Sequence, residues 1–272
     1  VFFLAGAADW IPLAPYEQMD WLHPSAPPGT MGHDPSSGHP LSDNGDEMVH
    51  IFGTDTMGRD ILARLIYGAR ISLGIGLAAP FIGILLGGVL GMLAGFYRGR
   101  SETVIISVMD AILAFPALVL LLAITFYLGP EIQNIVLALG FLTIPYFCRI
   151  ARANTLACAK QEFVRAARML GQSDVSILCR EIFPNAAPPV FVYGLLVVSY
   201  VIVAEGALSF LGLSVPPHIP SWGAMISEGR EVLDKAPHVS LIPGLILFLT
   251  VLSFNLIGDR LRGWADSREN QL

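Results

Sequence analysis

Residues 71–97 read ISLGIGLAAPFIGILLGGVLGMLAGFY, a stretch without a single charged side chain. A helix needs about 20 apolar residues to cross the hydrocarbon core of a bilayer, because each residue adds only about 1.5 Å. This stretch is long enough, and Arg70 and Arg98 bound it on its two sides. It therefore predicts a membrane-spanning helix.

Four further charge-free runs have the same character. They lie between Asp110 and Glu131, Glu131 and Arg149, Glu181 and Glu205, and Lys235 and Asp259. The run before Arg149 is the shortest, and we expect its helix to continue past that residue into the interface, where basic side chains can reach water. Residues 1–13 are interpreted as the end of a first transmembrane helix whose beginning precedes this sequence. The predicted fold is an all-α polytopic membrane protein with about six spans.

The composition agrees with a bilayer environment. Apolar residues make up 54% of the 272 residues, charged residues only 14%, and the mean hydropathy is +0.62. A water-soluble chain of this length would need an implausibly large core. The net charge of -6 arises mainly before the second span and does not indicate a nucleic-acid partner.

The distribution of lysine and arginine predicts the orientation, because cytoplasmic connections carry the excess of positive charge. When the spans are threaded alternately, one side holds Arg98, Arg100, Arg149, Arg152, Lys160, Arg165, Arg168, Arg180, Arg260, Arg262 and Arg268. The other side holds five basic residues. We therefore place the first side in the cytoplasm, with both termini there, and residues 14–57 in an extracytoplasmic loop of the bacterial inner membrane.

The predicted outer loop is rich in Pro, Gly, Ser and Asp between Pro15 and His50, which indicates little regular structure. All six histidines fall on the outer side. They lack metal-ligand spacing, so we interpret them as loop residues rather than a metal or haem site. The three cysteines form no CxxC pair and are interpreted as reduced structural thiols on the cytoplasmic side.

Polar and small residues within the spans predict further features. Pro116 should kink the third helix, because it removes a hydrogen bond. Gly83, Gly87, Gly91 and Gly95 recur every four residues in the second span and predict close helix packing. Two acids lie in or beside apolar runs, where charge is costly. Asp110 is near a helix end and can reach water, whereas the deeper Glu205 either tethers helices or lines a pathway.

The connection between the fourth and fifth spans, residues 160–188, predicts two short amphipathic helices. Apolar residues recur at helical spacing in each half, at Phe163, Ala166, Ala167 and Leu170, and again at Val175, Leu178, Cys179 and Ile182. Gly171 should allow the turn and Ser173 should cap the second helix. This predicts a helix-turn-helix with one apolar surface free for a partner.

This segment resembles the EAA loop of binding-protein-dependent ABC importers, the element that docks on the ATPase subunit. Its residues 162–167, EFVRAA, and 182–185, IFPN, are similar to the peptide and nickel permease branch. Other matches are to C-type subunits of that branch, at 53–60 (GTDTMGRD), 67–73 (YGARISL), 208–213 (LSFLGL), 221–225 (SWGAM) and 254–262 (FNLIGDRLR). Arg165 and Glu181 depart from the broader consensus and fit the branch.

The resemblance implies a set of roles and partners. It assigns ATPase coupling to Glu162, Arg165, Ala166, Ala167, Gly171, Ile182 and Pro184, with Pro184 ending the second coupling helix. It places an ABC permease domain at 58–272 and implies a second permease chain, two ATPase subunits that hold ATP and Mg, and an extracytoplasmic binding protein. The substrates of the branch are dipeptides, oligopeptides, nickel and sometimes haem.

The energy source separates this hypothesis from its alternatives. A P-loop requires GxxxxGK[ST], and neither of the two lysines, Lys160 and Lys235, has that context. The sequence therefore predicts a transport subunit and not an enzyme, with no cofactor of its own. An ion-gradient-driven secondary transporter and a passive channel remain alternatives, although no inverted repeat is seen.

One local pattern concerns the entry to the second span. Ile61, Leu62, Leu65 and Ile66 share an apolar face, with Arg59, Asp60 and Arg64 opposite. This predicts an interfacial helix that leads into the membrane.

Overall fold

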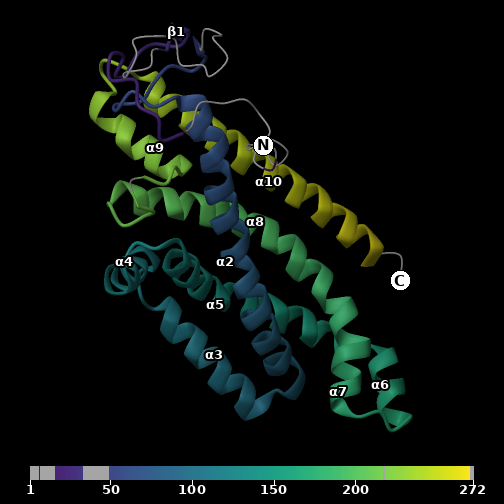
Figure 1. The fold of residues 1–272 in the computed structure, drawn as a ribbon. Helices are drawn as coiled ribbons and strands as arrows, with labels where there is room; N and C mark the ends of the chain where they lie inside the picture. The colour runs from purple at the N-terminus through teal and green to yellow at the C-terminus, as the bar shows by residue number, and fades with distance from the viewer. Residues whose placement is uncertain (1–5, 7–15, 33–48, 217, 270–272) are drawn as a thin grey trace. The chain divides into compact units, whose positions relative to one another are not determined.

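The computed structural model describes Gly6 and residues 16–32, 49–216 and 218–269, the side chains only as far as Gly263. The predicted first span, 1–13, and most of the predicted outer loop therefore lie outside the described residues. Helices dominate the remainder. In chain order the main ones are α2 (Ile61–Tyr97), α3 (Gly99–Leu113), α4 (Ala117–Leu128), α5 (Ile132–Cys158), α6 (Glu162–Met169), α7 (Asp174–Ile177), α8 (Phe183–Phe210), α9 (Trp222–Gly229) and α10 (His238–Glu269) (Figure 1).

Four helical stretches are long and apolar enough to cross a membrane: Ile61–Tyr97, Ile132–Cys158, Asp174–Phe210 and His238–Gly263. They contain four of the five charge-free runs, and α5 continues past Arg149 as expected. The mostly helical, multi-pass fold predicted from the sequence is thus confirmed.

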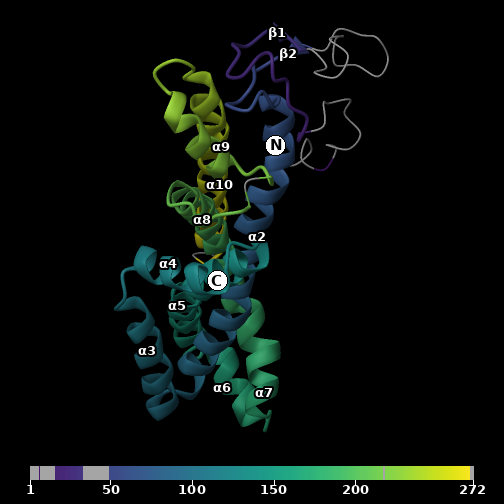
Figure 2. The ribbon, with the colours of Figure 1, turned by 60° about the vertical axis from the view of Figure 1, so that its left-hand side comes forward.

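The remaining run is not one straight span. The helices α3 and α4 meet at 84° across a short break that contains Pro116 (Figure 2). Proline has no N–H to donate and disfavours helical geometry in the residue before it, so α3 ends at Leu113. The expected kink is therefore a complete break, and α4 alone, with 12 residues, is too short to cross.

The chain divides into two compact units, each built from separate stretches of sequence. The first contains residues 1–75, 129–135 and 202–251, and the second contains 76–128, 136–201 and 252–272. Helices α2, α5, α8 and α10 contribute residues to both.

In the first unit, residues 16–32 fold back on residues 49–60, which corrects the expectation of little regular structure for this part of the loop. The strands β1 (Thr30–Met31) and β2 (Val49–His50) pair antiparallel. Backbone bonds continue the contact, among them Asp20 N–H to Gly58 O at 2.9 Å and Ser25 N–H to Asp55 O at 2.7 Å. Gly58, which approaches the backbone of Asp20 closely, has a φ of +76°, a left-handed conformation that favours glycine.

The start of α2 is buried in the same unit. Helix α2 is continuous from Ile61 to Tyr97, so the residues expected to form an interfacial helix are the first turns of the long helix itself. Trp222, fully buried at the start of α9, donates from Nε1 to Leu65 O at 3.1 Å and from its backbone N–H to Ser72 Oγ at 3.0 Å. These bonds fix the beginning of α9 against α2.

In the second unit, the predicted glycine stripe packs α2 against α5. A Cβ at Gly83, Gly87, Gly91 or Gly95 would lie within 3 Å of atoms of α5, whereas Gly88 has open space. The absence of side chains lets the two backbones approach closely. The packing role expected of the stripe is confirmed.

Candidate functional site

The helix-turn-helix predicted at 160–188 is present and lies in the second unit, where α6 and α7 run side by side (Figures 1 and 2). Gly171 follows the end of α6 with a φ of +76°, the left-handed conformation expected of the turn. Ser173 caps α7, and its side chain accepts from the Ser176 N–H at 3.4 Å. Both local predictions are confirmed.

A small apolar core holds this segment together. Val164 and Ala167 from α6 pack with Ile177, Leu178 and Ile182, together with Phe96 of α2 and Ala186 of α8. The exposure of Phe163, Ala166 and Leu170 agrees with the free apolar face expected of the first helix, but Ala167, which was placed on the same face, is buried. In the second half Ile177 is buried, whereas Val175 and Cys179 are exposed.

A π-helical turn, η2 (Leu178–Ile182), interrupts the α-helical spacing of the second half from Leu178 onward. A π turn takes more residues than an α turn, so it shifts the residues that follow round the helix axis. It also corrects the role of Pro184, which was expected to end the second helix. Pro184 lies in the first turn of α8, and helix continues from Asp174 to Phe210. The second coupling helix is thus the beginning of a spanning helix.

What remains exposed is an apolar tip. Met169 is 90% exposed and Leu170 81%, next to the turn at Gly171, and Phe163 of α6 and Val175 of α7 are exposed on the same two helices. We call these four residues the tip patch. Glu162, Arg165 and Ala166 are exposed on α6 as well. The segment therefore presents an apolar patch with charged neighbours, supported by its own core.

Comparison with known proteins decides the family. Residues 87–271 match the family described as "Binding-protein-dependent transport system inner membrane component". The chain belongs to this family. It is a permease subunit of the ABC importer type, as the order of its motifs predicted.

Relatives of the permease cover most of its length. The glutathione transport system permease protein GsiD of Pectobacterium atrosepticum is 39% identical over 224 residues, which is 82% of this chain and 74% of the relative. GsiD of Escherichia coli is 42% identical over 225 residues, covering 83% and 74%. A putative peptide transport system permease protein of Brucella suis is 42% identical over 221 residues, covering 81% and 74%.

Solved structures agree with the fold. The inward-facing MetNI methionine ABC transporter aligns with a TM-score of 0.62 at 16% identity, covering 74% of this chain and 95% of that one. An amino acid ABC transporter with histidines gives a TM-score of 0.57 at 20% identity, covering 73% and 92%. The permease thus has the fold of an ABC transporter membrane subunit.

Glu205 lies in the first unit of the permease and is completely buried. Its Oε1 accepts hydrogen bonds from the hydroxyls of Ser209 at 3.1 Å, Ser214 at 2.6 Å and Ser221 at 2.8 Å. Ser214 follows α8 and Ser221 caps α9, so one carboxyl oxygen joins α8 to the segment that leads into α9. Among the described residues its Oε2 has no hydrogen-bond partner. This geometry favours helix tethering over pathway lining.

Asp110 is at the surface of the second unit. Its Oδ1 accepts from Arg149 Nη2 at 2.6 Å, and both side chains are 54% exposed. One turn further along α5, Arg152 donates to Glu102 Oε1 from Nε at 2.7 Å. These pairs join α5 to α3, and the exposure of Asp110 agrees with the expected access to water.

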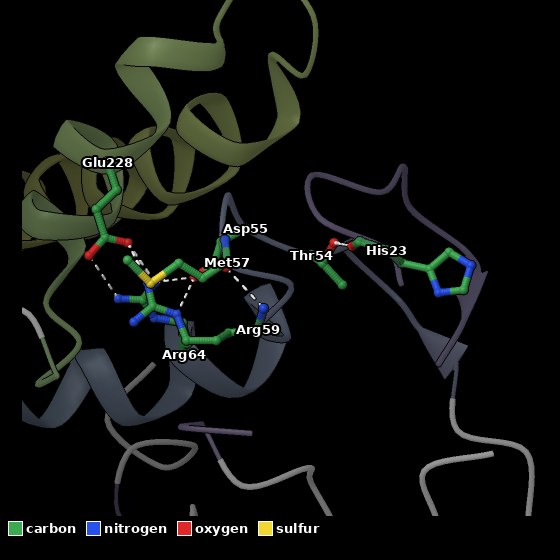
Figure 3. A network of polar contacts seen from close by, with 7 residues as sticks. All are labelled: His23, Thr54, Asp55, Met57, Arg59, Arg64 and Glu228. Atoms are coloured by element: carbon green, nitrogen blue, oxygen red, sulfur yellow. Dashed lines mark hydrogen bonds and ion pairs between the residues drawn. The ribbon is translucent and has the colours of Figure 1, made fainter. Parts of the chain in front are cut away.

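An ion network in the first unit was missed by sequence reasoning. Arg64 is 1% exposed, and it donates to Asp55 and to Glu228 of α9, with Arg64 Nη1 2.6 Å from Glu228 Oε2. Arg59 donates to the same two carboxylates at 2.7 and 2.9 Å (Figure 3). Arg59 and Arg64 are therefore not the water-facing side of an amphipathic helix. Local periodicity could not reveal Glu228 as the partner of these arginines. The one indication in the sequence was that Glu228 is an acid in a mostly apolar helix.

The histidines of the described loop segments also pair with carboxylates. His50 Nδ1 lies 2.7 Å from Asp60 Oδ2, and His23 Nδ1 lies 3.0 Å from Asp20 Oδ2. His50 and both acids are buried. These two pairs lie within their own loop segments, and His50 Nε2, 3.8 Å from Asp20 Oδ2, links one segment to the other. His33 and His39 lie outside the described residues.

Proposed function

We propose that this permease forms half of the translocation pathway of an ATP-driven importer for di- or oligopeptides, including tripeptides such as glutathione. Its partners are a second permease chain, two ATPase subunits that bind ATP and Mg, and an extracytoplasmic binding protein, in a bacterial inner membrane. The substrate class is supported by relatives of about 40% identity that are named as glutathione or peptide permeases. The boundaries 1–13, 14–57 and 58–272 belong to the same proposal.

The proposal that the permease couples to the ATPase rests on the tip patch of residues 160–188. Large side chains such as Met169 and Leu170 are almost fully exposed, although the helices that bear them already have a closed core. An exposed apolar patch in an aqueous compartment is typical of a protein contact. We therefore assign the tip patch to docking on the ATPase, with Arg165 at its edge.

The buried residues of the segment have a supporting role in this proposal. Ala167 and Ile182 belong to the internal core, and Gly171 forms the turn that presents the tip. Pro184 lies in the first turn of α8, close to the π turn that precedes it. These residues position the docking surface and do not themselves contact the partner.

The test is a pair of charge insertions at exposed positions. Leu170→Glu places a carboxylate in the tip patch, where docking would bury it unpaired at a cost of several kcal/mol. Cys179→Glu adds the same charge at an exposed position outside the patch and is the matched control. We expect the Leu170 variant to insert in the membrane but to lose the ATPase on co-purification, whereas the control retains it.

Two outcomes would contradict the proposal. Retention of the ATPase by the Leu170→Glu complex would remove the docking role. Uptake into vesicles that continues without ATP and stops when ion gradients are collapsed would instead favour a secondary transporter.

A further inference from the structure

Three tyrosines of the second unit line one cavity. Tyr146 comes from α5, and Tyr193 and Tyr200 lie two turns apart on α8. With Leu196 and Val197 they surround a volume of about 200 Å³. The ring of Tyr193 packs edge-on against Phe147, with 5.7 Å between centroids and 81° between planes. Packing thus holds at least this ring in place.

The hydroxyls of these tyrosines are available to a ligand. No described residue of the chain forms a hydrogen bond with any of the three. All three belong to stretches that are apolar and long enough to span the membrane. A hydroxyl that faces hydrocarbon forfeits the hydrogen bonds it would make in water, which is unfavourable. The hydroxyls therefore require water or a polar ligand in the cavity.

A charged pair lies close to the cavity on the same helix. Arg149 lies one turn from Tyr146, and its side chain and that of its partner Asp110 are each 54% exposed. The sequence places Arg149 at the interface, where basic side chains reach water. This end of α5 is therefore close to the aqueous interface, from which water or a polar ligand can meet the phenols.

We propose that Tyr146, Tyr193 and Tyr200 form a contact site for the transported peptide within the pathway. This inference rests on the proposed function and names residues and substrate class for it. Each phenol can donate and accept a hydrogen bond, as a peptide amide can, and each ring offers an apolar face to side chains. Among the residues that the structure describes, no carboxylate, imidazole or thiolate lines the cavity, so the lining does not offer the ligands that nickel prefers. The site therefore recognises peptide amides and tolerates different side chains.

The experiment uses the complete transporter in proteoliposomes. Tyr146→Phe, Tyr193→Phe, Tyr200→Phe and the triple variant remove hydroxyls and keep the rings. Tyr127→Phe is the matched control, because Tyr127 is 89% exposed on α4 and is not among the residues that line the cavity. ATP-driven uptake of labelled trialanine and glutathione is measured beside ATP hydrolysis without substrate.

We expect each single variant to lower uptake about two- to tenfold, as the loss of one hydrogen bond predicts, and the triple variant more. Assembly and basal ATP hydrolysis should be unchanged, and Tyr127→Phe should transport normally. Wild-type uptake by the triple variant would overturn the inference. Absence of uptake of both peptides by the wild-type complex would instead reject the proposed substrate class.

A photo-crosslinking residue at position 193 gives an independent readout. A crosslink to labelled trialanine during turnover supports the site. Crosslinks only to the second permease chain or only to lipid would overturn it, because they would show that another molecule fills the cavity.

Discussion

Gly91 of α2 lies directly against the carbonyl group of Cys148 on α5. A Cβ at position 91 would be 2.3 Å from Cys148 O, closer than any real side-chain carbon approaches an oxygen. The two helices are thus held at a separation that only glycine permits, and the whole stripe from Gly83 to Gly95 acts in the same way.

This contact makes a sharp prediction for alanine substitution. Gly91→Ala must push α2 away from α5 and should destabilise the permease by a few kcal/mol, as overpacked cores do. Gly88→Ala is the control, because nothing lies within 4 Å of its Cβ position. Thermal unfolding of the purified proteins in detergent measures the difference. Equal melting temperatures for the two variants would contradict the close packing.

The turn at Gly171 makes a second prediction. Its φ of +76° is unfavourable for residues with a Cβ, and no other atom lies within 4 Å of a Cβ at this position. A side chain at this position therefore affects only the backbone conformation. Gly171→Val should destabilise the turn by at least about 1–2 kcal/mol and misplace the tip patch. Gly171→Asn should be tolerated, because asparagine adopts this conformation more readily.

The measurement for Gly171 is ATPase binding together with ATP-driven uptake. We expect the valine variant to lose both in part and the asparagine variant to keep them. If both variants behave alike, the left-handed turn does not control the position of the tip patch.

A third prediction concerns Glu205, because a helix-tethering role and a pathway-lining role predict different results for its substitution. Glu205→Gln keeps an acceptor for the three serine hydroxyls and should fold and transport almost normally. Glu205→Leu leaves those buried hydroxyls without their acceptor, at about 1–3 kcal/mol for each unsatisfied group. Thermal stability and uptake are measured in parallel. A stable glutamine variant without transport would show that the carboxylate serves the pathway.

The ion network gives a fourth prediction. Arg64→Ala would remove the more deeply buried of the two arginines that Asp55 and Glu228 share and leave only Arg59 to pair with both, so we expect a loss of stability that approaches, but stays below, the about 3–5 kcal/mol of a broken buried pair. Glu228→Gln should be milder, because its carboxylate is 24% exposed and water can reach the arginines there. Membrane yield and melting temperature provide the readout. Equal stability of Arg64→Ala and wild type would show that the network contributes little.

The sequence by itself determined the features that depend on local chemistry. Charge-free runs identified the helices that span, because a bilayer cannot accommodate unpaired charges over such a length. Glycine periodicity identified the packing stripe, Gly171 and Ser173 identified a turn and a cap, and the order of motifs identified the family. Apart from the motif order, which extends along the chain, the residues that carry each signal lie close together in the sequence.

Only the tertiary structure decided the features that depend on distant contacts. Ala167 is buried because Phe96 and Ile177 cover it, although helical periodicity placed it on the free face. Arg64 is buried because it forms an ion pair with Glu228, 164 residues away in the sequence. Helix continues through Pro184, with a π turn directly before α8. Periodicity within one helix shows which residues share a face, but the neighbour that covers that face comes from elsewhere in the chain, so burial and pairing are decided only when the helices pack.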